Sequence, residues 1–181
     1  MNRARQGLLT LAPVIALLLP LAACDIDVRG GESGRKADVD VRTPVGAVSV
    51  RTDVKSPDTG LPVYPGGRPR RDAERAPESA NVDIGTSWFG VKVVAAKYES
   101  DDAPEKILEF YRKEMQTYGT VTECKGDIDF KGRKPVCKER LSSRDIQLLV
   151  GTEERQRVVS VKPRGSGAEF DVVYVQTRGG S

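Results

Sequence analysis

Residues 101–119, DDAPEKILEFYRKEMQTYG, carry the clearest helix pattern in the chain. Pro104 suits the first turn of a helix, and Asp101 or Asp102 can cap its start. Gly119 is placed to end it. The apolar residues inside this stretch recur at the spacing of one buried stripe, with Phe110 at its margin: Ile107, Leu108, Tyr111, Met115 and Tyr118. The pattern therefore predicts one amphipathic helix that packs on another layer of structure.

Strand patterns lie on both sides of this helix. Residues 87–100, SWFGVKVVAAKYES, are rich in β-branched and aromatic side chains, which indicates a strand. Shorter strand candidates follow the helix: Thr120–Cys124, Val136–Leu141, Asp145–Gly151, Arg157–Lys162 and Glu169–Gln176. One helix lying across a mostly antiparallel sheet is the simplest way to bury the apolar stripe. The predicted fold class is therefore α+β, for a domain over residues 81–178.

Residues 24–80 are expected to form a tether that contains a β-hairpin. ADVDVRT at 37–43 and GAVSVRTDV at 46–54 alternate valine with polar residues, and TPVG between them suits a turn. A lone hairpin with only small apolar side chains is marginally stable in water, so it must pack on something, pair with a partner or remain flexible. Of these, we expect 37–54 to be flexible or weakly ordered. Proline, glycine and charge dominate residues 55–80, which indicates a linker. Only LPVYPGG at 61–67 is apolar enough to pack on the domain.

The first 23 residues have the features of an export signal. Arg3 and Arg5 are their only charges, and a run of apolar residues and prolines follows, broken only by Thr10. A positive start, an apolar centre and small residues at the end indicate a secretory signal peptide over residues 1–23. The run is too short and too interrupted for a comfortable spanning helix of about 20 residues.

LAAC at 21–24 lies where the apolar run meets an acidic segment. It resembles the lipobox of bacterial lipoproteins, in which a branched residue and two small ones precede an invariant cysteine. The resemblance implies that the Cys24 sulfur receives a diacylglyceryl group and that the chain is cut before Cys24. The new amino group is then available for acylation, for example with palmitate. Two or three acyl chains anchor stably, so membrane lipid is the first expected partner.

Asp25 follows the lipobox cysteine directly. In many two-membrane bacteria an acidic residue there resembles the signal for retention in the inner membrane. In an organism that follows this rule, the resemblance implies a location in the periplasm, at the inner membrane of the cell envelope. A fainter resemblance covers residues 61–176, because P-x-Y-P-G segments like that at 62–66 open a class of uncharacterised bacterial secreted domains. It implies an extended segment followed by strand, helix and strands.

Lipid on Cys24 leaves Cys124 and Cys137 as the remaining cysteines. Two cysteines in an oxidising compartment tend to pair. The residues between them, KGDIDFKGRKPV, contain the glycines and the proline that allow the chain to turn back. No CxxC spacing supports a redox-active pair. We therefore expect a structural disulfide between Cys124 and Cys137.

Composition limits the chemistry that is open to this chain. It has 29 basic and 26 acidic residues, and removal of the signal leaves the mature chain almost neutral. Such a balance gives no overall basic field for nucleic acid, which is not expected as a partner. The chain has no histidine, the commonest general base and transition-metal ligand. We expect no cofactor and no metal, and we expect that the protein is not an enzyme.

Three functions remain open. The first is a non-catalytic interaction or structural module with an envelope protein as partner. The second is a lipoprotein that binds a small ligand or a cell-wall glycan, with Tyr64, Trp88 and Phe89 as candidate ligand-binding residues, although such aromatic residues more often belong to a core. The third is a histidine-free hydrolase built on paired acids. An arginine cluster near the anchor could also contact anionic lipid headgroups or glycans: Arg68, Arg70, Arg71 and Arg75.

Overall fold

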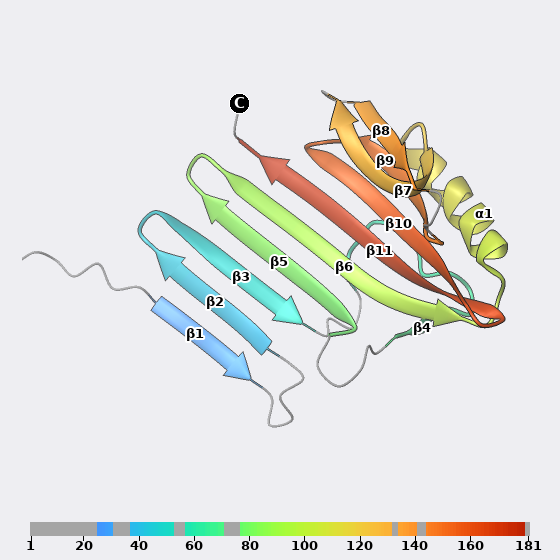
Figure 1. Ribbon diagram of the computed structural model, residues 1–181. Helices are drawn as coiled ribbons and strands as arrows, with labels where there is room; N and C mark the ends of the chain where they lie inside the picture. The colour runs from blue at the N-terminus through green and yellow to red at the C-terminus, as the bar shows by residue number, and fades with distance from the viewer. Residues whose placement is uncertain are drawn as a thin grey trace, which may run out of the picture.

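Strands that alternate apolar and polar residues build one long antiparallel sheet in a computed structural model of the chain (Figure 1). The structure describes residues 25–30, 37–52, 57–70, 77–131, 134–140 and 144–179. The strands are β1 Asp25–Gly30, β2 Ala37–Thr43, β3 Gly46–Thr52, β4 Arg68–Pro69, β5 Ser79–Thr86, β6 Gly90–Ser100, β7 Thr122–Lys131, β8 Lys134–Glu139, β9 Ile146–Thr152, β10 Arg155–Arg164 and β11 Gly167–Arg178. Their order is β1-β2-β3-β5-β6-β11-β10-β9-β7-β8, and β4 pairs with β6.

One helix, α1 Pro104–Met115, lies across β9 and β10 and confirms the predicted α+β class. Its buried side chains belong to the predicted stripe: Ile107, Leu108, Tyr111 and Met115. The cap differs from the prediction. Ala103 occupies the N-cap position without a side-chain hydrogen bond. The Asp102 carboxylate instead accepts hydrogen bonds from Lys106 Nζ at 2.8 Å and from the Tyr64 hydroxyl at 3.1 Å.

Tyr118 was expected in the buried stripe, but 41% of it is exposed. The α-helix ends at Met115, and a 3-10 turn over Gln116–Tyr118 follows, so the tighter rotation takes Tyr118 away from the stripe. The guanidinium of Arg157 lies 3.6 Å from the centre of the Tyr118 ring instead. Gly119 ends the turn with a φ of 133°, a conformation that favours glycine.

The core lies between α1 and the face of the sheet that it covers. Phe170 of β11 is at its centre, because its ring stacks on Tyr98 of β6 and also contacts Tyr111 of the helix. Residues 61–67 pack on this core through Tyr64, as the sequence allowed. The remaining members are aliphatic side chains, chiefly Val159 and Val161 of β10 and Leu148 and Val150 of β9.

The hairpin expected within 37–54 is present as β2 and β3, while residues 53 and 54 lie outside the described part. It differs from the flexible element that we expected, because β3 pairs with β5 over its whole length and so continues the sheet of the domain. A lone hairpin is only marginally stable in water. A hairpin added to an existing sheet gains a full set of ladder hydrogen bonds along one more strand. Strand β1, inside the predicted tether, extends the sheet by one further strand.

Other strands also differ from the sequence-based expectation, which included neither β4 nor β5. The predicted strand over 87–100 begins only at Gly90, since residues 87–89 form the turn that joins it to β5. Strand β7 continues beyond Cys124 to Lys131 and pairs with β8, where the sequence indicated turns. Gly126 allows this continuation, because its φ of 138° lets the backbone pass close to the backbone of β8.

Candidate functional site

Tyr64, one of the candidate ligand-binding residues, belongs to the core. Its ring meets those of Phe110 and Phe170 edge to face, with centroids 5.3 and 6.1 Å away. Its backbone N–H donates to the hydroxyl oxygen of Tyr111 at 3.3 Å. Burial raises the pKa of the Tyr64 hydroxyl, and its hydrogen bond to the Asp102 carboxylate adds to this. The side chain is therefore used to dock residues 57–70 on the helix.

Trp88 and Phe89, the other two candidates, are on the turn between β5 and β6. They are 70% and 39% exposed. The Phe89 N–H donates to Thr86 Oγ1 at 2.9 Å, and the Thr86 N–H donates to the Phe89 carbonyl at 2.6 Å, which closes the turn. Tyr64 instead packs on Phe170, whose partner Tyr98 lies roughly 25 Å from this turn along β6, at about 3.3 Å per residue. The three aromatic residues therefore form no common groove.

The cysteines expected to pair are joined in the structure, where Cys124 of β7 is bonded to Cys137 of β8 with their Cα atoms 5.4 Å apart. Cys124 is buried in the part of β7 that pairs with β9, so the bond links β8 to that part of β7. Cys24, the predicted lipidation site, lies outside the described residues. No helix in the described part of the chain is both long enough and apolar enough to cross a membrane.

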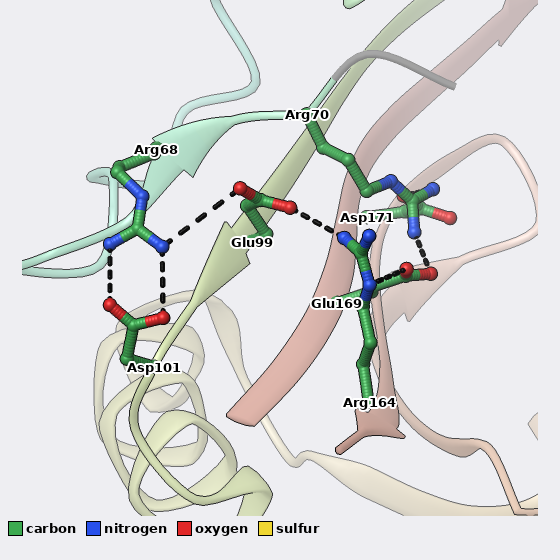
Figure 2. Close-up of polar contacts among 7 residues, drawn as sticks. All are labelled: Arg68, Arg70, Glu99, Asp101, Arg164, Glu169 and Asp171. Carbon is green, nitrogen blue, oxygen red and sulfur yellow. Dashed lines mark hydrogen bonds and ion pairs between the residues drawn. The ribbon is translucent and has the colours of Figure 1, made fainter. Parts of the chain in front are cut away.

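Arginine and acidic residues alternate in a network at the end of β6 and the start of β11 (Figure 2). Arg68 binds Asp101 through two hydrogen bonds of 2.8 and 3.0 Å and lies 3.9 Å from Glu99. Arg164 links Glu99, at 2.6 Å, to Glu169, at 3.1 Å. Arg70 then pairs with Glu169 and, at 3.4 Å, with Asp171. The network ties residues 68–70 to the sheet.

Within this network, Asp101 is poorly suited to donate a proton. The Arg68 guanidinium holds the pKa of the Asp101 carboxyl below its ordinary value, so Asp101 stays ionised at neutral pH. A general acid needs the opposite shift. Arg68 and Arg70, half of the arginine cluster noted in the sequence, are engaged with acidic side chains of the same chain, and Arg71 and Arg75 lie outside the described residues.

A second surface runs across the N-terminal half of the sheet. Residues that face each other in antiparallel pairs share one side of a sheet, and the pairing registers place valine or isoleucine opposite one another from β1 to β11. These side chains form two rows, which we call the valine face: Ile26, Val41, Val48, Ile84 and Val91 in one row, and Val28, Val39, Val50, Val82, Val93 and Val175 in the other.

The valine face is on the side of the sheet away from α1. On β6, Val91 and Val93 alternate with Val94 and Ala96, which are buried on the helix side. No helix or strand among the described residues is stacked on the valine face (Figure 1). Ile26 and Val28 at its edge are each 62% exposed, and none of its members belongs to the buried core. Within the described part of the chain it is therefore an uncovered apolar surface, most exposed at the β1 edge.

The opposite side of the same strands carries charges. Asp25, Asp27 and Arg29 of β1 alternate with Ile26 and Val28 and so point to the helix side of the sheet. Asp38, Asp40 and Arg42 of β2 do the same. The first strands of the chain are thus apolar on one face and charged on the other, which is the pattern of a sheet with one face to be covered.

Two exposed apolar features of the described residues are suited to binding a partner. Among these residues, no group of three or more cysteine, aspartate or glutamate side chains is placed to hold a metal ion. The groups that stand out are the valine face and the exposed turn with Trp88, neither of which carries a nucleophile and a base.

Comparison with known proteins gives no match for this chain among family models, curated proteins or solved structures.

Proposed function

We propose that this chain is a lipid-anchored, non-catalytic structural module of a bacterial cell envelope, which associates with a second copy of itself through the valine face. The observation that supports this function is the open valine face itself. Contiguous apolar surface on a folded protein marks a site of interaction. The lipobox-like LAAC at 21–24 supports the anchor.

A second copy suits this surface because it needs no complementary charge. The side chains of the valine face are all apolar, and they are nearly equal in size. Two such faces can meet across a twofold axis, where each surface contacts itself. Sheets pack in this way about 10 Å apart, with their strands aligned to within about 30°. The association would convert two half-covered sheets into a sandwich.

The size of the valine face predicts a weak contact that depends on the anchor. Strand spacing makes it roughly 25–30 Å wide, and two rows of side chains make it roughly 13 Å long. A pair of such faces buries on the order of 800 Å², less than the 1,200–2,000 Å² typical of stable complexes. Confinement of both copies to one membrane raises their effective concentration and favours pairing without further contacts.

Site-specific photocrosslinking tests the association in the lipidated, full-length protein. A photoreactive phenylalanine analogue replaces Val50, on the valine face, or Ser49, the next residue on the opposite face of β3. We expect an adduct of twice the mass from position 50 and not from position 49. A Val41→Asp change in the position-50 protein should remove the adduct while the circular dichroism spectrum stays unchanged. Equal yields from both positions, or an adduct with a different protein alone, would reject the pairing.

Metabolic labelling tests the anchor separately. A tagged fatty acid should mark the wild-type protein, and Cys24→Ser should abolish the label, because the resemblance to the lipobox assigns the acyl groups to that sulfur and amino group. Cys124 and Cys137 are paired with each other, so they offer no alternative thiol. Equal labelling of the wild type and the variant would refute lipidation at Cys24.

A further inference from the structure

One end of the sheet carries exposed apolar side chains on two adjacent turns. Val45 is on the β2–β3 turn and is 66% exposed, while Trp88 and Phe89 are on the β5–β6 turn. The two turns are neighbours because Gly46 pairs with Thr86. We call these three side chains the sheet tip. We infer that the sheet tip lies in the surface of the lipid bilayer to which the chain is anchored, an inference that rests on the lipid anchor in the proposed function.

The residue that follows the predicted anchor cysteine is at the same end of the sheet. Cys24 is bonded to Asp25, the first residue of β1, and Asp25 pairs with Arg42. Arg42 is followed within three residues by Val45. Because β1 begins at Asp25, little chain separates the acyl groups from the sheet, and the end that carries Val45 must stay close to the membrane. In Figure 1, β1 starts on the side where the β2–β3 and β5–β6 turns lie.

The opposite end of the sheet is charged. From Gly90, beside the sheet tip, to Ser100, β6 extends over roughly 33 Å at 3.3 Å per residue. At that far end Arg68, Asp101 and Arg164 belong to the charge network (Figure 2). The β10–β11 turn, with Ser166 exposed, is also there, since Ala168 pairs with Ser100. Asp25, Arg42 and Arg178 also lie beside the sheet tip, where lipid headgroups can surround them, so the exposed apolar turn residues set the end of the sheet that meets the bilayer.

The side chains of the sheet tip match the chemistry of the membrane interface. Tryptophan is enriched where bilayer meets water, because its large apolar ring carries one polar N–H that stays hydrated. The turn that presents Trp88 is held in place from both sides. Hydrogen bonds between Thr86 and Phe89 close it, and Gly179 at the end of β11 passes so close to the Trp88 carbonyl that a side chain there would clash. A fixed turn positions the indole at low entropic cost.

The chain provides its own probe, because Trp88 is its only tryptophan. The lipidated, full-length protein is reconstituted into vesicles of phosphatidylethanolamine and phosphatidylglycerol that contain lipids with brominated acyl chains, which quench indole fluorescence on contact. We expect Trp88 to emit at shorter wavelength than in water and to lose most of its intensity to the brominated lipid. Val45→Ser combined with Phe89→Ser should reduce both effects, with the circular dichroism spectrum unchanged.

A matched variant moves the tryptophan to the other end of the sheet. In W88F/S166W the single indole lies at the charged end and should emit as in water and resist quenching. Quenching of Trp88 no greater than that of this variant would overturn the inference while leaving the lipid anchor intact. Fatty-acid labelling of the same preparation separates the two claims, because a chain that takes up no label refutes the anchor and the membrane contact together.

Discussion

Replacement of Tyr64 by alanine should destabilise the protein strongly, because this side chain docks residues 57–70 on the core. Tyr64 is only 9% exposed and contacts the rings of Phe110 and Phe170. Truncation of a buried aromatic side chain to alanine costs about 3–5 kcal/mol. Each kcal/mol lowers the melting temperature of a chain of this size by about 2–4 °C, so we expect a loss of roughly 6–20 °C.

Urea unfolding followed by circular dichroism measures this loss, with Val63→Ala as the matched control. Val63 precedes Tyr64 but is 49% exposed, so its truncation should cost less than about 0.5 kcal/mol. Tyr64→Phe keeps the ring contacts and removes only the hydroxyl bonded to Asp102, so its effect should be much smaller than that of alanine. A Tyr64→Ala protein within about 1 kcal/mol of the wild type would show that residues 57–70 are not part of the core. Tyr64 would then regain its place as a candidate ligand-binding residue.

Other predictions follow from the same structure. Leu108→Ala should cost about 2–5 kcal/mol because Leu108 is buried, and Lys113→Ala less than about 0.5, so similar losses in urea unfolding would mean that the helix face is misplaced. Intact mass should rise by two hydrogens on reduction of the Cys124–Cys137 bond, and replacement of both cysteines should lower stability by about 3 kcal/mol at most; two thiols that alkylate without reductant would refute the bond. Lys106 lowers the pKa of the Asp102 carboxyl below its ordinary value of 3.8, so Asp102 stabilises the fold above that pH and the benefit is lost as the pH falls through the lowered value. Asp102→Asn should therefore be less stable than the wild type at pH 7, and this difference should vanish in acid; a difference that persists would assign the effect to packing.

Elements with a strong local pattern could be predicted from the sequence. The helix at 104–115 combines a regular apolar stripe with a proline at its start, and its buried residues all belong to the predicted stripe, in which only Tyr118 was wrongly placed. Tyr118 lies outside the buried stripe because of the 3-10 turn and its contact with Arg157, which is distant in sequence. The disulfide followed from counting cysteines, because one of three was assigned to lipid.

The continuity of the sheet could not be predicted, because it depends on pairing across a linker. Strands β3 and β5 are separated by residues 53–78, and nothing local in either strand specifies the other. The alternation of DIDVRG at 25–30 is short and mostly polar, so the sequence did not indicate strand β1. The candidate site failed for the same reason. Tyr64 and Trp88 both lie near glycines in the sequence. In the fold, Tyr64 packs near the Tyr98 end of β6 and Trp88 is on the turn at its Gly90 end.

The two proposals impose one geometry on the membrane-bound pair. Two copies that meet through the valine face could be related by a twofold axis across the strands or parallel to them. An axis across the strands would place Trp88 of one copy beside the charged end of the other, and the two Cys24 anchors would then lie at opposite ends of the sandwich. An axis parallel to the strands sets both sheet tips and both anchors at the same end, so that one bilayer can hold both copies. Because the sheets of a sandwich align to within about 30°, this arrangement is compatible with close packing of the valine rows. Membrane anchoring therefore selects the parallel axis and directs both charged ends away from the bilayer.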